Sequence, residues 1–190
     1  MTYKAVFDAR GLSRFDKPLR YRKDRDLPFD AAQVAPGELL VLDTCAVIDG
    51  LKNTLPLEIG MAIANGVVLA SAVVIGELVH GHASLKPSHP MTARNAAAIL
   101  DAIEAAEALP TCLAPSPLQW AEANAVVATV GRCNAIPKDA RHRLLADALI
   151  YVSARDAGAR IVTANVADFD LIDRAATGAR LLFYRPTTVP

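Results

Sequence analysis

Four acidic residues of this sequence stand where a carboxylate is costly unless it is paired or bound to a cation. Asp43 ends the apolar run ELLVLD, and Asp168 follows the apolar run IVT in TANVADFD. Glu77 and Asp147 each interrupt an apolar helical surface, in SAVVIGELVHG and RLLADALIYVSA. Taken one at a time, such acids are often helix caps or members of surface ion pairs.

Those structural explanations are open for each acid. Asp43 would cap a helix that begins directly after it, Asp147 would pair with Arg143 or Arg155, and Glu77 with a nearby base. The apolar surroundings offer too few basic partners for all four, and converging carboxylates repel one another unless divalent cations neutralise them. Oxygen ligands without a Cys/His cluster suit Mg²⁺ or Mn²⁺ rather than Zn²⁺. We therefore expect a metal site.

The elements that must position these acids are apolar strands alternating with helices. Strands are expected at 38–43, 67–71, 160–165 and 180–184, and helices at 56–64, 72–79, 92–108, 116–130 and 138–156. This alternation predicts an α/β fold, with a central, mostly parallel β-sheet flanked by helices. Functional residues of such sheets gather at the carboxyl ends of the strands, where Asp43 and Asp168 lie.

Four segments carry a resemblance to a known family, namely DTCAVID, SAVVIGELVHG, LLADALIYVSA and IVTANVADFDLI. In this order they resemble the four motifs of PIN-domain nucleases, and specifically those of the VapC-type toxins of bacterial type II toxin–antitoxin systems. The resemblance covers residues 38–190. It implies a PIN-like fold and an endoribonuclease that hydrolyses RNA phosphodiester bonds with Mg²⁺, for which Mn²⁺ would substitute.

The resemblance also assigns site residues. The acidic quartet of the family falls on Asp43, Glu77, Asp147 and Asp168. The first and third of these acids are expected to bind an ion directly, the second to be a ligand or to orient the attacking water, and the fourth to hold a second, weaker ion. Polar positions that support the metal site match Thr44, Thr163 and Asn165.

Cys45 departs from the first motif of the family, which usually has Asn there. We interpret the change as the tolerated loss of a supporting hydrogen bond. A nucleophilic thiol is disfavoured because no His stands nearby as its base. The chain has three cysteines, an odd count without framework spacing, which fits free thiols and a cytoplasmic location.

Several other residues near the motifs have less specific interpretations. Gly81 is expected to end the helix that carries Glu77. The basic run from Arg141 to Arg143 would form either a phosphate-holding edge or a solvated helix face. Asp170 and Asp173 are explained by a short exposed helix after the last motif.

The chain divides near Pro36 and Gly37 into two parts. Residues 1–37 form an N-terminal extension, flexible or partner-binding, and residues 38–190 form the nuclease domain. The chain has 20 Lys and Arg residues against 20 Asp and Glu residues, so its overall charge does not indicate a polyanionic partner. The stretch from Arg20 to Arg25 would nevertheless contact RNA phosphates. The uncharged stretch 59–76 is parsed as helix, turn, strand and helix, so no membrane span is expected.

Partners follow from the resemblance, which implies an RNA substrate, a cognate antitoxin protein and a homodimer. The alternative is a non-catalytic PIN-like module that binds nucleic acid or the antitoxin. A haloacid-dehalogenase-like phosphatase is disfavoured because Cys45 stands where its second Asp would be. The four carboxylates favour the nuclease over the non-catalytic module, which would have no need for a crowded acidic pocket.

Overall fold

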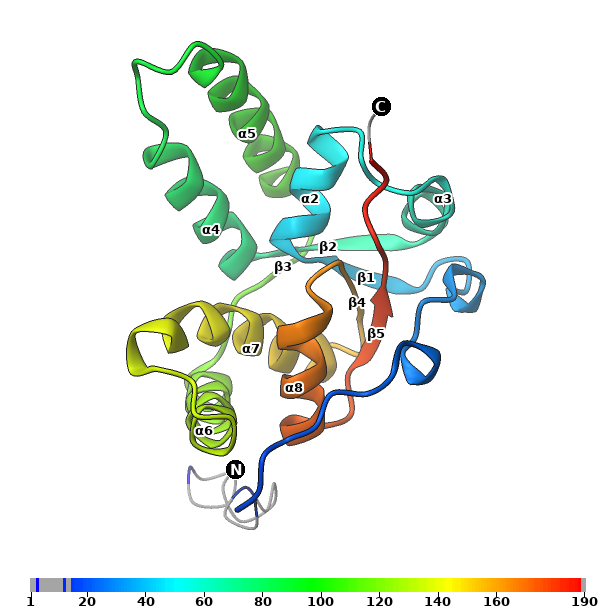
Figure 1. The fold of residues 1–190 in the computed structure, drawn as a ribbon. Helices are drawn as coiled ribbons and strands as arrows, with labels where there is room; N and C mark the ends of the chain where they lie inside the picture. Colours follow the sequence, from blue (N-terminus) through cyan, green and yellow to red (C-terminus); the bar gives the residue numbers. More distant parts are fainter. Residues whose placement is uncertain (1–2, 4–11, 13–14, 189–190) are drawn as a thin grey trace.

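A parallel sheet forms the centre of the computed structural model, which describes residues 3, 12 and 15–188 (Figure 1). Its strand order is β3-β2-β1-β4-β5, and every neighbouring pair is parallel. The strands are β1 (Leu39–Leu42), β2 (Val67–Ser71), β3 (Cys112–Leu113), β4 (Arg160–Thr163) and β5 (Arg180–Phe183). The predicted α/β fold is confirmed. The short β3 was not predicted, because two residues are too few to show a periodic pattern.

Helices connect the strands and cover both faces of the sheet. They are α2 (Thr44–Leu51), α3 (Leu57–Asn65), α4 (Ala72–Ala83), α5 (Thr92–Glu107), α6 (Pro117–Cys133), α7 (Arg141–Asp156) and α8 (Val166–Ala176). Single 3-10 turns are η2 (Asp24–Asp26), η3 (Ala31–Gln33) and η4 (Lys138–Ala140). The expectation that Gly81 ends its helix was wrong. A glycine inside a helix costs only about 1 kcal/mol relative to alanine, and α4 continues past it.

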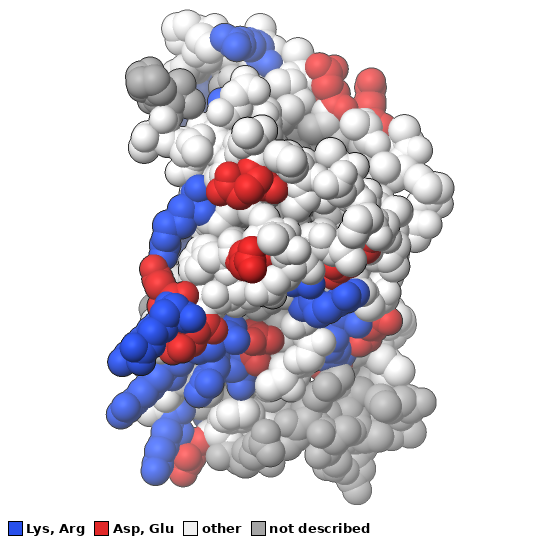
Figure 2. Space-filling view, turned by 90° about the vertical axis from the view of Figure 1, so that its right-hand side faces the viewer, with Lys and Arg blue, Asp and Glu red and all other residues white. Residues whose placement is uncertain are grey.

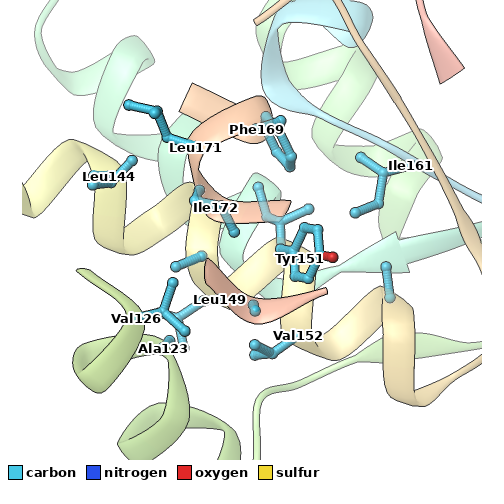
Figure 3. Packing of buried hydrophobic residues seen from close by; sticks show 14 of the residues in the cluster. Ala123, Val126, Leu144, Leu149, Tyr151, Val152, Ile161, Phe169, Leu171 and Ile172 are labelled. Atoms are coloured by element: carbon cyan, nitrogen blue, oxygen red, sulfur yellow. The ribbon is translucent and has the colours of Figure 1, made fainter. Parts of the chain in front are cut away.

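Alternate residues of the strands point to opposite faces of the sheet. Val41, Ile161 and Leu181 lie side by side and belong to the large apolar core under α6, α7 and α8. Figure 3 shows this core, in which Val126, Leu149 and Ile172 converge from the three helices. The next row of the sheet, Leu42, Val162 and Leu182, faces the smaller cluster that includes α3. Burial on both faces explains why the strands read as continuous apolar runs.

The uncharged stretch 59–76 folds as predicted. It contains most of α3, the turn at Gly66, β2 and the first residues of α4. Within the described ranges, no helix combines the length and the apolar character needed to cross a membrane.

The described part of the N-terminal extension packs against the domain. Residues 15–37 run across α8 and beside β5, where Pro28 accepts a hydrogen bond from the backbone N–H of Phe183 at 2.8 Å (Figure 1). Leu19 and Leu27 are buried. Positions 1–2, 4–11 and 13–14 of the predicted extension lie outside the described residues. On the face shown in Figure 2, basic and acidic side chains are interleaved.

The extension also covers part of α8, which was expected to be exposed. Asp170 and Asp173 were expected on an exposed helix, but Asp170 is 1% exposed. Its carboxylate accepts hydrogen bonds from the backbone N–H of Arg22 at 2.7 Å and from Nε of the same residue at 2.5 Å. The expectation was wrong because a residue far away in sequence covers this helix and neutralises its charge.

Candidate active site

Asp43 stands at the carboxyl end of β1 and caps α2. Its Oδ1 atom accepts the backbone N–H of Thr44 at 2.8 Å. Its Oδ2 atom accepts the hydroxyl of Thr163 at 2.7 Å and the thiol of Cys45 at 2.9 Å. The side chain is 3% exposed. Groups from β4 and from the first turn of α2 therefore fix this carboxylate. Burial raises the pKa of Asp43, because it disfavours the charged form, whereas a cation bound nearby would favour that form.

Cys45 makes a hydrogen bond that the sequence did not indicate. Its sulfur donates to Asp43 and accepts the backbone N–H of Ala164 at 3.2 Å. The expected loss of a supporting hydrogen bond at this position was wrong, because a thiol is itself a weak donor. Burial and then the charge of Asp43 raise the pKa of Cys45 to about 12, which keeps the thiol protonated and able to donate.

Glu77 reaches the site from the second turn of α4, which begins directly after β2. Its Oε2 atom accepts the hydroxyl of Thr44 at 2.5 Å. Burial, and to a smaller degree the charge of Asp43, raise the pKa of Glu77. Thr44 therefore joins two acids, since its backbone binds one carboxylate and its hydroxyl binds the other.

Asn165 joins the other two acids. It is the N-cap of α8, and its Nδ2 atom donates to Oδ2 of Asp147 and to Oδ2 of Asp168, both at 3.1 Å. Its own backbone N–H donates to the hydroxyl of Thr163 at 2.9 Å. The amide of Asn165 thus holds carboxylates from α7 and α8 together. Thr163, which accepts the backbone N–H of Asn165, donates in turn to Asp43 at the end of β1.

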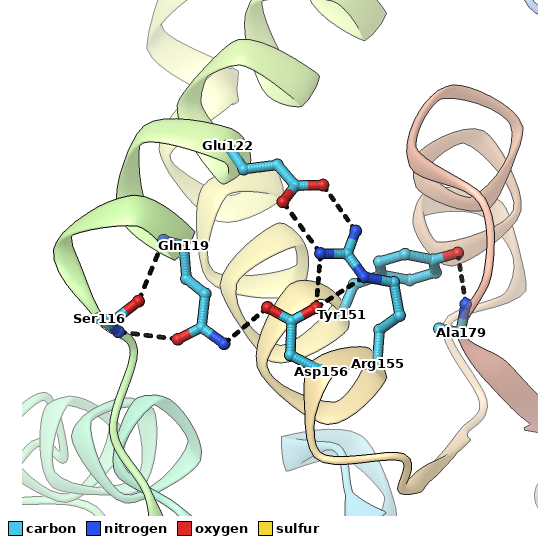
Figure 4. A network of polar contacts seen from close by, with 7 residues as sticks. All are labelled: Ser116, Gln119, Glu122, Tyr151, Arg155, Asp156 and Ala179. Atoms are coloured by element: carbon cyan, nitrogen blue, oxygen red, sulfur yellow. Dashed lines mark hydrogen bonds and ion pairs between the residues drawn. The ribbon is translucent and has the colours of Figure 1, made fainter. Parts of the chain in front are cut away.

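Asp147 shows the electrostatic strain of the site most clearly. It is 7% exposed, and burial together with the charges of Asp43, Asp168 and Glu77 raises its pKa to about 8. Of the two partners considered from the sequence, Arg155 instead binds both oxygens of Glu122 on α6 at 2.6 and 2.9 Å (Figure 4).

None of the four acids forms an ion pair with any other residue in the described ranges. Of the structural explanations, capping holds for the acid at the end of β1, whereas no described residue forms an ion pair with any of the four acids.

The four acids open into one cavity of about 460 Å³. Thr44, Cys45 and Asn165 also line it, whereas Thr163 lies behind the wall and acts through its hydrogen bonds. Arg143 lines the cavity as well, as the phosphate-edge interpretation requires. Other parts of the wall come from Ile136 and Ala140, in the connection between α6 and α7. Sequence reasoning missed these two residues, because they belong to no motif.

The oxygen atoms around this cavity suit a hard divalent cation in their chemistry. Asp43 and Asp147 are buried with raised pKa values, and the four carboxylates, held by hydroxyl and amide donors, would lose their mutual repulsion on binding one. The described side chains include no group of three or more His, Cys, Asp or Glu already gathered around a single point. Instead, carboxylate oxygens of the site accept hydrogen bonds from the side chains of Thr44, Thr163 and Asn165.

Comparisons with known proteins show the family and the fold of this chain. Residues 40–175 match the family model of the PIN domain. Among solved structures, VapBC2 from Rickettsia felis bound to a DNA fragment from its promoter has a TM-score of 0.52 and 15% identity, covering 77% of this chain and 99% of that one. VapBC-1 from nontypeable Haemophilus influenzae also has a TM-score of 0.52, with 21% identity over 76% and 97% of the two chains. No curated protein matches. At these identities the structural likeness concerns the fold.

Proposed function

The chain belongs to the PIN domain family, and we propose that it is a Mg²⁺-dependent endoribonuclease that acts as the toxin of a toxin–antitoxin pair. The proposal is carried by one observation, the convergence of four carboxylates from β1, α4, α7 and α8 on one cavity. So many acids without an ion-pair partner in the described ranges are most simply explained by a cation that binds among them.

In this proposal the residues keep the roles that the family resemblance suggests. Asp43 and Asp147 hold the Mg²⁺ ion, or Mn²⁺ in its place. Glu77 is a further ligand or orients the attacking water, and Asp168 holds a second, weaker ion. When bound, the ion supplies Lewis-acid polarisation of the phosphate and an activated water.

Neighbouring groups set the geometry before RNA arrives. Thr44 and Asn165 each hold two carboxylates in fixed relation, and Thr163 and Cys45 orient the acid at the end of β1. Arg143, exposed at the cavity wall, is placed to contact a phosphate oxygen of the substrate. Such preorganisation lowers the reorganisation needed during the reaction.

A cognate antitoxin protein is the proposed partner, by analogy with the VapBC assemblies that share this fold. A homodimer and a cytoplasmic location remain parts of the same proposal.

The proposal is tested with Asp43→Asn and Asp147→Asn, which keep side-chain size and remove the charge. We expect cleavage of RNA in Mg²⁺ to fall at least ~100-fold in both variants, since even residues that only support a metal ligand are worth 10 to 100-fold. The matched control is Asp101→Asn on the exposed surface of α5, which should cleave like the wild type. EDTA should abolish cleavage.

Two results would contradict the proposal. Folded variants that keep Mg²⁺-dependent cleavage would remove the acids from the active site. A wild-type chain that binds antitoxin and nucleic acid but cleaves no RNA in Mg²⁺ or Mn²⁺ would be a non-catalytic binding module.

A further inference from the structure

A second cavity, of about 330 Å³, lies between α4, α6 and α7. Its wall is mostly apolar and includes Ala72, Gly76, Trp120, His142, Leu145 and Leu149. We call it the Trp120 groove. Its lining includes no Asp or Glu from the described part of the chain, in contrast to the acidic cavity next to it.

Trp120 is the distinctive residue of this groove. It is the single tryptophan of the sequence, and 45% of its surface is exposed. Tryptophan is strongly buried on average in folded proteins, so a half-exposed indole in a concave apolar site needs an explanation. An aromatic face open to a groove is the feature on which unpaired nucleobases stack.

Helices α4 and α7 contribute residues to both the Trp120 groove and the acidic cavity. On each helix, one residue lines the groove and the next residue lines the cavity. On α4, Gly76 lines the groove and the next residue, Glu77, lines the acidic cavity. On α7, His142 lines the groove and Arg143 lines the cavity. A nucleic-acid strand whose phosphate lies at the acids would therefore have the cationic Arg143 beside it in the cavity wall, which fits the charge of a phosphate chain.

Gly76 supplies an independent observation. It lies inside α4, where glycine costs roughly 1 kcal/mol relative to alanine. A Cβ atom added at this position would meet no other atom within 4 Å, so packing does not require glycine there. The missing side chain leaves open space at this point of the groove wall, which favours a flat ligand such as a base.

We propose that the Trp120 groove binds an unpaired nucleobase of the substrate, next to the phosphodiester that lies at the acidic cavity. The proposal rests on the proposed nuclease function and deepens it by assigning a binding site for a base of the substrate. A base held in a duplex cannot leave its stack to enter the groove without losing its pairing.

Binding is tested first with the wild-type chain. Its only indole is the reporter, and titration in EDTA with a single-stranded RNA 12-mer should quench the fluorescence of Trp120. The same strand in a blunt duplex should quench much less. Labelled-RNA anisotropy should show affinity about tenfold or more weaker for Trp120→Ala, because a stacked base is worth roughly this much. Trp120→Phe should stay within a few-fold of the wild type.

Gly76→Leu is a second variant, which fills the groove and leaves the indole in place. It should weaken RNA binding about as much as Trp120→Ala. In Mg²⁺, both changes should lower kcat/KM for the 12-mer and leave kcat/KM unchanged for a small phosphodiester that carries no nucleobase. A purely structural defect would lower both. The matched control is Met61→Ala on α3, an apolar residue that is 58% exposed and lies outside both cavities.

The outcomes separate this inference from the proposed function. Unchanged RNA affinity and cleavage in Trp120→Ala and Gly76→Leu, with an active wild type, would overturn the inference alone. A change in oligomeric size or antitoxin binding without any change toward RNA would also overturn it, and would make the groove a protein interface. An inactive wild type whose fluorescence is still quenched by single-stranded RNA, with weaker RNA binding in Gly76→Leu, would support the groove and contradict the nuclease.

Discussion

At the scale of single residues, the raised pKa of Asp147 predicts how stability depends on pH without a metal. The pKa is about 8 in the folded chain and near 4 for an ordinary aspartate. Between these values the folded state holds a proton that the unfolded state has released, so the free energy of unfolding falls as pH rises. Below pH 4 and above pH 8 this contribution is constant.

Urea unfolding in EDTA at pH 5.5, 7 and 8.5 measures the effect. We expect the wild type to lose at least about 1.4 kcal/mol across this range, the equivalent of one pKa unit. Asp147→Asn should show a flatter profile and be more stable than the wild type at pH 8.5. Excess Mg²⁺ should restore stability at high pH, because it binds the deprotonated folded state. A wild-type profile that rises with pH would contradict the raised pKa.

At the scale of elements, the start of α8 combines a helix cap with an arrangement of charges. Asn165 caps the helix and donates to both Asp147 and Asp168. Asn165→Ala should lower the free energy of unfolding by about 1 kcal/mol through loss of the cap. Asn165→Asp keeps a capping oxygen but replaces the shared donor by another carboxylate. In EDTA at pH 8 it should be less stable than Asn165→Ala, and added Mg²⁺ should reverse their order, which calorimetry can test.

The elements around the site could be predicted because each leaves a local pattern. Asp43 and Asp168 follow apolar strands, and Asp147 interrupts an apolar helix, so each was visible within a short window. The hydrogen bond of Cys45 could not be predicted, because it depends on where β4 places Ala164. The same holds for β3 and for the cavity wall between α6 and α7, whose sequences are too short or too irregular to show periodicity.

At the scale of the whole molecule, the described part of the N-terminal extension packs against the domain. Arg22 supplies the neutralising charge for Asp170, which lies two residues beyond the candidate ligand Asp168. Its Nη2 atom also lies 2.9 Å from Asp173. Because Arg22 and Asp170 are 148 residues apart in the sequence, this contact could not be predicted from any short segment.

Arg22→Ala leaves the carboxylate of Asp170 buried without a cation, and breaking a buried ion pair from one side typically costs 3–5 kcal/mol. Because Arg22 is partly exposed, we expect a loss near the lower end, about 3 kcal/mol, in urea unfolding. Asp170→Asn in the same chain should recover part of that loss, since the uncompensated charge is gone. The matched control is Arg25→Ala, whose exposed pairing with Asp26 is worth less than about 1 kcal/mol. Deleting residues 1–37 should destabilise the chain at least as much as Arg22→Ala, because it also removes three buried leucines, Leu12, Leu19 and Leu27. A fragment 38–190 as stable as the full chain would show instead that the extension is not part of the folding unit.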